Sequence, residues 1–137
     1  MNAFTPLVVL LLSVQHMQNL TPALSELPDG QHYYAEHHAE PISSELTRTR
    51  ALFLQKWGRI VVGVDTLSSS RRACFKGFVE ENAIVDATRV LPPYTPNAEW
   101  TYQLGEMINL SHYDRRTDAI AATDRAALDI CLEVFAR

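Results

Sequence analysis

One short stretch of the sequence, QHYYAEHHAE, holds most of the residues that could bind a divalent metal ion. Zinc and similar ions prefer imidazole and carboxylate ligands. The adjacent His37 and His38 cannot both point into one tight site from a helix, and the His-Glu-x-x-His pattern is missing. We therefore predict a polar loop around residues 28–41 and no bound metal, with a small metal-dependent hydrolase as the alternative function. That alternative would use His32, Glu36, His37, His38 and Glu40, joined by His112.

The two cysteines, Cys74 and Cys131, are the candidate nucleophiles. A catalytic thiol needs a histidine that is oriented by a carboxylate or an amide, and His112 with Asp114 could supply both. Neither cysteine lies in a local catalytic signature, and Cys131 falls in an apolar stripe, where free cysteine behaves as a small hydrophobe. We predict structural roles for both and no catalytic residue. In an exported protein the two could bridge, which would add on the order of 4 kcal/mol of stability.

Tyrosine and arginine side chains without an evident structural task are the candidates for binding a partner. Both types combine a large apolar body with a polar tip, and they dominate the hot spots of protein interfaces. Paired arginines can also bind carboxylates through two parallel hydrogen bonds. The predicted partner-binding residues lie in loops that precede predicted helices, and they are Tyr33, Tyr34, His37, Tyr113, Arg115 and Arg116.

The length, composition and net charge of the chain limit the classes of protein to which it can belong. A chain of 137 residues has the size of one domain, and 47% hydrophobic with 20% charged residues is ordinary for a folded protein. A formal net charge of -4 disfavours nucleic-acid binding, which normally requires a basic excess. The five glycines do not cluster, so there is no phosphate-binding loop and no cofactor is predicted.

The N-terminal apolar run from Leu7 to Leu12 resembles the centre of a signal peptide, but no lysine or arginine precedes it. We predict a buried helix that begins near Thr5 and Pro6 and that packs in the core or against a second copy of the chain. Polar residues interrupt the run too soon for a membrane span. The cytoplasm is slightly favoured over the periplasm.

The stretch from Pro41 to Arg72 is predicted to form a central helix. Leu46, Phe53, Ile60 and Leu67 recur every seven residues, which places one apolar stripe along a helix. Further helices are expected from Asn82 to Leu91, after Asn97, and from Thr117 or Asp118 to the end of the chain.

The predicted fold is therefore mostly α, a single domain of residues 1–137 with about five helices packed on the central one. The alternative is α+β, because the β-branched segment Arg59–Val64 could form a hairpin with Ala73–Val79.

Two segments, GRIVVGVDTLSSSRRACF from Gly58 to Phe75 and Ile84 to Asp86, are similar to the Gly-x-Ile-x-Gly-Val-x-Asp and cysteine pattern of the Rap/Tai family of immunity proteins. The C-terminal AALDICLEVFAR resembles the last amphipathic helix of that family. Asp65 comes one place early, and the residues from Tyr94 to Thr117 form an insert. The resemblance implies a small, mostly helical protein that neutralises peptidoglycan-degrading effectors of the type VI secretion system.

From these observations we predict a non-enzymatic protein that binds and neutralises a protein partner, of the immunity or inhibitor type. The partner would be a bacterial toxin or effector, and the chain would pair with itself as a homodimer in one version of this hypothesis.

Overall fold

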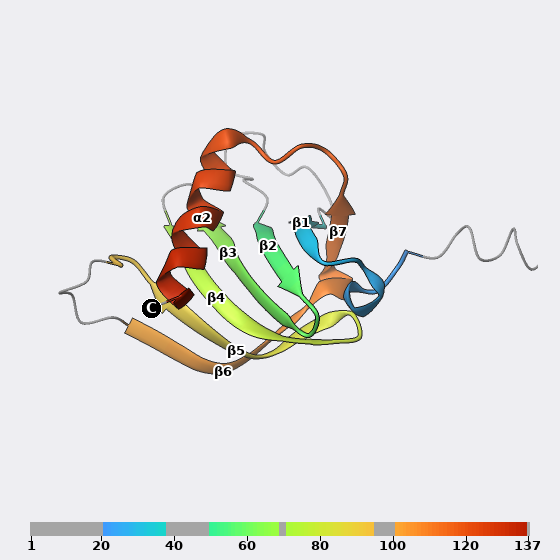
Figure 1. The fold of residues 1–137 in the computed structure, drawn as a ribbon, viewed down its shortest axis with the longest axis horizontal. Helices are drawn as coiled ribbons and strands as arrows, with labels where there is room; N and C mark the ends of the chain where they lie inside the picture. The colour runs from blue at the N-terminus through green and yellow to red at the C-terminus, as the bar shows by residue number, and fades with distance from the viewer. Residues whose placement is uncertain (1–20, 38–49, 69–70, 95–100, 137) are drawn as a thin grey trace, which may run out of the picture.

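Seven antiparallel strands form the sheet that organises this chain (Figure 1). The structure is a computed structural model, and it describes residues 21–37, 50–68, 71–94 and 101–136. The strands are β1 (Gly30–Glu36), β2 (Ala51–Trp57), β3 (Ile60–Ser68), β4 (Arg71–Glu80), β5 (Ala83–Leu91), β6 (Thr101–Asn109) and β7 (Tyr113–Arg116). Two 3-10 turns, η1 (Leu24–Glu26) and η2 (Leu110–His112), and the α-helix α2 (Ala122–Ala136) complete the described elements.

The sheet curls because its two edges are joined by a very short connection. The strand order is β6-β5-β4-β3-β2-β1-β7, so β6 and β7 lie at opposite edges. Only η2 separates them along the chain. Four Cα–Cα steps, from Asn109 to Tyr113, span at most about 14 Å. The two edges therefore approach each other at η2, and the sheet has an inner face toward η1 and η2 and an outer face toward α2.

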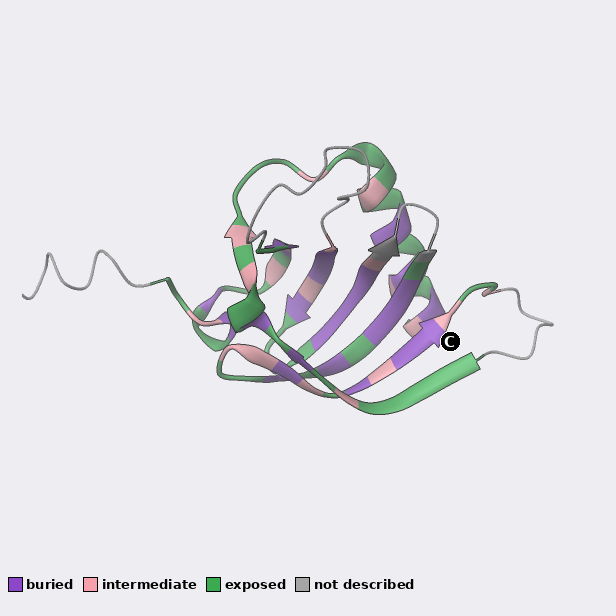
Figure 2. Cartoon of the chain, turned by 180° about the vertical axis from the view of Figure 1, so that it is seen from behind, coloured by how far each residue is buried: buried purple, intermediate pink, exposed green. Residues whose placement is uncertain are grey.

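Each face of the sheet carries its own apolar cluster, because successive residues of a strand point to opposite sides. The inner cluster joins strand residues such as Leu52, Leu54 and Phe75 to Leu24 of η1 and Leu110 of η2. The outer cluster packs α2 on β2, β3 and β4 through Ala51, Phe53, Val64, Cys74, Val90, Ala127, Leu128, Cys131 and Val134. Figure 2 shows that β6, at one edge, is mostly exposed.

Tight turns set the register of the hairpins. Trp57 pairs with Ile60, so Gly58 and Arg59 alone form the β2–β3 turn, and Gly58 has a φ of 56°, which favours glycine. Its N–H donates to Asp29 Oδ1 at 2.8 Å. In the β4–β5 turn, Asn82 accepts hydrogen bonds from the N–H groups of both 3-10 turns, from Leu24 at Oδ1 and from Leu110 at its carbonyl.

The predicted mostly α fold is wrong. Within the predicted central helix of residues 41–72, the described part forms β2, β3 and the start of β4, and residues 41–49 lie outside the described residues. The cause is that β3 is buried on both faces, so its run of Val61, Val62 and Val64 has no period of two to reveal a strand. Phe53 and Ile60 do share one face, but across a hairpin rather than along a helix.

Other predicted elements also change type. The polar loop around residues 28–41 contains β1, the helix from Asn82 is β5, and the described part of the helix after Asn97 is β6. The last predicted helix is present as α2, although it begins at Ala122 and not at Thr117 or Asp118. The hairpin of the α+β alternative is present as the antiparallel pair β3 and β4. The N-terminal helix was predicted in residues outside those described.

In the described part of the chain, no helix is both long and apolar enough to span a membrane.

Candidate partner-binding surface

The pairing of β1 with β7 brings the predicted partner-binding residues together, although about 80 positions separate their two groups along the sequence. Tyr33 pairs with Arg116, Tyr34 with Arg115, and Glu36 with Tyr113. His37 follows directly, and its N–H donates to the His112 carbonyl at 3.0 Å. From the sequence, these residues were predicted to lie on separate loops, each before the start of a helix. The structure instead places them on one ladder at the edge of the sheet.

The ladder divides these residues between the two faces of the sheet, because cross-strand partners share a face. Tyr34 and Arg115 point to the inner face, while Tyr33 and Arg116 point to the outer face. Tyr34 is only 3% exposed, so a partner cannot reach its ring. The surface open to a partner therefore consists of Tyr33, Arg116 and His37, with the partly exposed Tyr113 and Arg115 behind them.

On the outer side of the ladder, one aromatic and one ionic contact fix the two exposed side chains. The Tyr33 ring lies against the Phe53 ring, with 4.6 Å between the centroids. Arg116 Nη2 donates to Asp118 Oδ2 at 2.9 Å. This hydrogen bond raises the pKa of Arg116 and lowers the pKa of Asp118. Both side chains are exposed, so water and salt screen the pair and a partner can compete for it.

A pocket of about 210 Å³ opens where β7 stops and β1 continues. β7 pairs only with Tyr33–Glu36, so none of the described strands lies beside the first part of β1 on that side. His32 is buried there, and its Nε2 lies 2.9 Å from the Pro28 carbonyl. Arg115 Nε is buried and has no hydrogen-bond partner among the described residues. The lining residues are Gln31, His32, Tyr33, Arg115, Arg116, Thr117, Asp118 and Ile120.

At the other end of the ladder, His37 joins the segment that leads into β7. Its Nδ1 lies 3.0 Å from Asp114 Oδ2, and its Nε2 lies 3.2 Å from the Ser111 carbonyl oxygen. Both ring nitrogens therefore face oxygen acceptors. These contacts hold His37 to the protein surface and give the exposed end of the ladder a defined shape.

The residues considered for metal or thiol chemistry do not assemble in the described part of the chain. His32 is bound to Pro28, His37 is bound to Asp114, and His38 and Glu40 lie outside the described residues. Among the described residues, no group of three or more histidine, cysteine or acidic side chains could hold a metal ion. Cys74 and Cys131 form a disulfide, so a triad of Cys74, His112 and Asp114 would have no free thiol.

A polar cluster on the inner face was not among the sites predicted from the sequence. Asp65 is fully buried and accepts hydrogen bonds from Arg50 Nε at 3.0 Å, Arg50 Nη2 at 2.6 Å and Arg89 Nη1 at 2.7 Å. Arg89 also donates from Nε to Glu106 at 2.9 Å. Ala73 of β4 pairs with Asp65, so Arg89 reaches Asp65 from β5 across the strand that lies between them. The available signal was one aspartate after an apolar run, since a buried carboxylate requires a partner.

The pKa is raised at two arginines and two tyrosines near this cluster. The hydrogen bonds to Asp65 raise the pKa of Arg50 against the opposing effect of its burial. Burial alone would lower the pKa of Arg89, but the hydrogen bonds and charges of Asp65 and Glu106 raise it. Burial raises the pKa of Tyr34 and Tyr113, while nearby arginines oppose the change. Near neutral pH the two arginines thus stay charged and the two tyrosines stay neutral.

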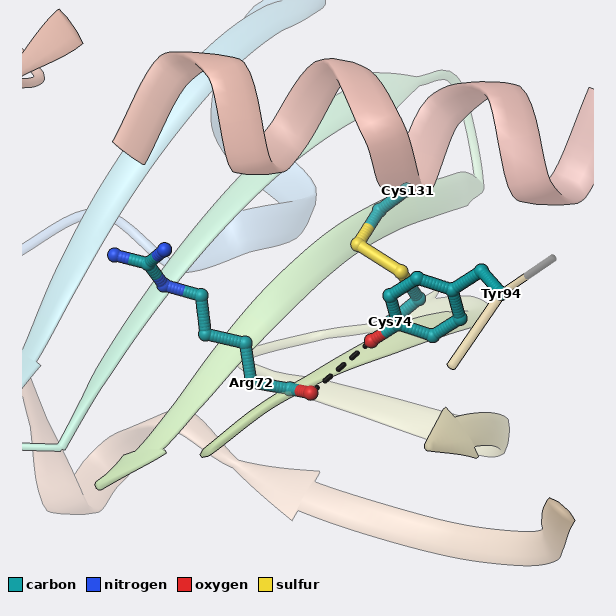
Figure 3. Close-up of a disulfide and its surroundings, with 4 residues drawn as sticks. All are labelled: Arg72, Cys74, Tyr94 and Cys131. Atoms are coloured by element: carbon teal, nitrogen blue, oxygen red, sulfur yellow. Dashed lines mark hydrogen bonds between the residues drawn. A yellow bond between two sulfur atoms is a disulfide. The ribbon is translucent and has the colours of Figure 1, made fainter. Parts of the chain in front are cut away.

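A second hollow, of about 320 Å³, lies between α2 and the sheet, beside the disulfide. Figure 3 shows the bond between Cys74 of β4 and Cys131 of α2, with Tyr94 and Arg72 on either side. The Tyr94 hydroxyl donates to the Arg72 carbonyl at 3.0 Å, and Arg72 Nη2 lies 3.4 Å from Asp124 Oδ1. Small α2 side chains create the space, and the lining is Val64, Arg72, Tyr94, Thr123, Ala126, Ala127, Ile130 and Cys131.

Comparison with known proteins gives no relative: no family model, no curated protein and no solved structure matches this chain. The segment that resembles the Rap/Tai pattern forms most of the hairpin β3–β4 here, so the helical fold implied by that resemblance is not the fold of this chain. The site must be interpreted from its own geometry.

Proposed function

We propose that this chain is a non-enzymatic protein that binds a protein partner and thereby neutralises it, in the manner of an immunity protein or inhibitor. The pocket at the end of the β1–β7 ladder carries the proposal. There Arg115 holds a buried Nε without a hydrogen-bond partner among the described residues. Leaving such a donor unpaired costs about 1–3 kcal/mol, or more for a charged group. An acceptor supplied by a partner would remove that cost once the Arg115 side chain turned outward, because its Nε is buried in the unbound chain.

The chemistry of the pocket favours an acidic side chain of the partner. Arg115 and Arg116 both line it, and an arginine can bind a carboxylate through two parallel hydrogen bonds. Asp118 holds Arg116 only through an exposed pair, which a second carboxylate can replace. Tyr33 adds a flat aromatic surface beside the charge, a combination that is typical of interface hot spots.

Two further features support the neutralising role and its location. The resemblance to Rap/Tai immunity proteins suggests a toxin or effector as the partner, and it stays a prediction. The disulfide between Cys74 and Cys131 suits an oxidising compartment, because thiols in the cytosol are kept reduced. We therefore propose that the chain works outside the cytosol, which reverses the slight preference drawn from its N-terminal sequence.

The proposal is tested by capture of partners from an extract of the source organism on the tagged full chain, followed by affinity measurement with the protein retained. Replacement of Arg115 and Arg116 together by glutamine should weaken that affinity by about 2 kcal/mol or more, close to 30-fold. Arg59→Gln is the matched control, because Arg59 is an exposed arginine in the β2–β3 turn.

Raised salt should weaken the wild-type complex more than the double variant. A complex that forms equally well with the double variant, or that is lost with Arg59→Gln alone, would place the binding surface elsewhere on the molecule.

A second copy of the chain is the other partner that the sequence suggested. Such a pairing is better supported on the outer face of the sheet, where exposed apolar side chains lie in one row.

A further inference from the structure

Part of the outer face of the sheet is apolar and is not covered by α2, the only described helix that packs on that face. α2 packs on the part that contains Phe53, Val64, Cys74 and Val90. Toward the β2–β3 and β4–β5 turns, Trp57 pairs with Ile60, Ile60 with Phe78, and Phe78 with Val85, so their side chains form one row across four strands. Trp57 is 49% exposed, Ile60 40% and Phe78 43%. Large apolar side chains that lie together in this way mark a surface that another molecule covers.

The row continues onto the edge strand β6. Ile108 pairs with Ile84 and belongs to the inner cluster, so its neighbour Met107 points to the outer face. Met107 is 67% exposed. With strands about 4.8 Å apart, five strands make the row about 19 Å wide. We call this row the outer stripe, and it consists of Trp57, Ile60, Phe78, Val85 and Met107.

Charged residues flank the stripe on its middle strand in an ordered way. Lys76 and Glu80 lie two positions before and two positions after Phe78 on β4, so both point to the outer face. β4 keeps a regular register with β3 through this region, because the extra residue of the β4–β5 bulge lies on β5 near Asp86. Both charged side chains are exposed. On β4 the stripe is thus flanked by a positive residue on one side and by a negative residue on the other.

We propose that the outer stripe is the interface of a two-fold symmetric homodimer, in which two sheets pack face to face with Phe78 of one copy against Phe78 of the other. A two-fold axis along the stripe reverses the strand direction of the second copy. Lys76 of each copy then lies opposite Glu80 of its partner, and the apolar row lies on itself. A two-fold axis along the strands would instead place Lys76 against Lys76, and that arrangement is disfavoured by repulsion. A closed pair of this kind is the commonest form of soluble oligomer.

A second copy fits this surface for a specific reason. The pattern of positive, apolar and negative residues is its own complement after the two-fold rotation, so no other partner needs to be invoked to satisfy both charges. The inference concerns a different face from the β1–β7 surface and does not depend on the proposed function.

Sedimentation equilibrium of the purified, oxidised full chain tests the interface. We expect a concentration-dependent dimer, and Phe78→Asp should weaken it on the order of 30-fold or more, because each dimer contains the change twice. Ile130→Asp is the control, since Ile130 is an equally exposed apolar residue on α2, at 50%, and lies outside the stripe. Circular dichroism confirms that both variants are folded.

A charge exchange tests the orientation. Lys76→Glu alone and Glu80→Lys alone should each weaken the dimer, because each leaves like charges opposite one another. The double variant with both changes should restore it. A wild-type chain that stays monomeric, a dimer that survives Phe78→Asp, or a double variant that dimerises no better than the single ones would overturn the proposal.

Discussion

The two faces of the same sheet are stabilised by different means, and β3 shows the contrast best. Its inner residues include Gly63 and Asp65, which serve close packing and a buried ion-pair cluster. Its outer residues include Val62 and Val64, of which Val64 packs in the cluster around the disulfide-linked helix. The inner face therefore depends on non-covalent contacts that leave little room for change. The outer face depends on one helix and one covalent bond, and part of it stays uncovered.

The largest effect is expected on the inner face at Asp65. Asp65→Asn keeps the shape of the side chain but leaves Arg50 and the buried Arg89 without their shared carboxylate. Loss of one partner from a buried ion pair typically costs 3–5 kcal/mol, and we expect about 5 kcal/mol less free energy of unfolding because two arginines are affected. Urea denaturation followed by circular dichroism measures this.

Asp118→Asn is the matched control, since Asp118 makes the same kind of bond to Arg116 at the exposed surface. Its melting temperature should not change measurably. If Asp65→Asn and Asp118→Asn lost similar amounts of stability, the contribution of these ion pairs to stability would not depend on their burial.

On the outer face, removal of the disulfide should have the next largest effect. The bond joins residues 57 positions apart. Chain entropy predicts that Cys74→Ala with Cys131→Ala lowers the free energy of unfolding by about 4 kcal/mol. Wild-type protein unfolded in dithiothreitol should lose a comparable amount. Two free thiols in the denatured, unreduced wild-type chain would show instead that the bond does not form.

Close packing on the inner face is tested by two glycines. A Cβ on Gly63 would lie 2.5 Å from the Phe75 ring and 2.6 Å from the Phe53 carbonyl oxygen, which is backbone and cannot turn away. On Gly77 the nearest atom is the Cγ2 methyl of Ile84, at 2.6 Å, and the nearest backbone atom, the Val85 carbonyl oxygen, lies farther away, at 3.1 Å. We expect Gly63→Ala to cost about 3 kcal/mol and Gly77→Ala less. Thermal denaturation of the two variants should rank them in that order, and the reverse order would contradict this account of the packing.

The smallest effect is expected at Tyr34. Its hydroxyl is buried and has no hydrogen-bond partner among the described residues, so Tyr34→Phe should raise the free energy of unfolding at neutral pH by about 1 kcal/mol. Above pH 10 this advantage of the variant should grow. Burial raises the Tyr34 pKa above its ordinary value of 10.0, so the unfolded chain releases this proton first.

Stability from Tyr34 is therefore complete below pH 10 and is lost as the pH rises through the raised pKa. Urea midpoints at pH 7 and at alkaline pH measure both effects. Tyr34→Phe will still lose some stability at alkaline pH, because burial also raises the pKa of Tyr94 and Tyr113. An equal alkaline loss in wild type and variant would contradict the assignment.

The elements that could be predicted from sequence are those with one buried face. α2 was found because its apolar residues repeat at the helical period on one side only. The strands were missed where both sides are buried, as in Val61–Val64, and where a residue typical of helix caps serves a turn instead, as Asn82 does. The hairpin alternative had the correct local signals in Gly58 and the β-branched run, but the seven-residue spacing was given more weight.

The candidate site was predicted in composition but not in arrangement. Tyr33 and Arg116 are neighbours only because β7 returns to pair with β1, a long-range contact that no local pattern encodes. Their residue types still identified them as binding candidates. Tyr34 has the same type as Tyr33 but is buried, because adjacent strand positions point to opposite faces. Without the strand assignment this alternation could not be seen.

The disulfide also determines what a protease could separate. It closes a ring that contains β5, β6, η2 and β7. A single cut at any peptide bond inside that ring, including one between β5 and β6, would leave both new ends attached through Cys74 and Cys131. The nicked chain would keep its full mass until a reductant reached the bond. If the chain works outside the cytosol, as proposed, a single proteolytic cut there would leave the sheet and its helix covalently tethered.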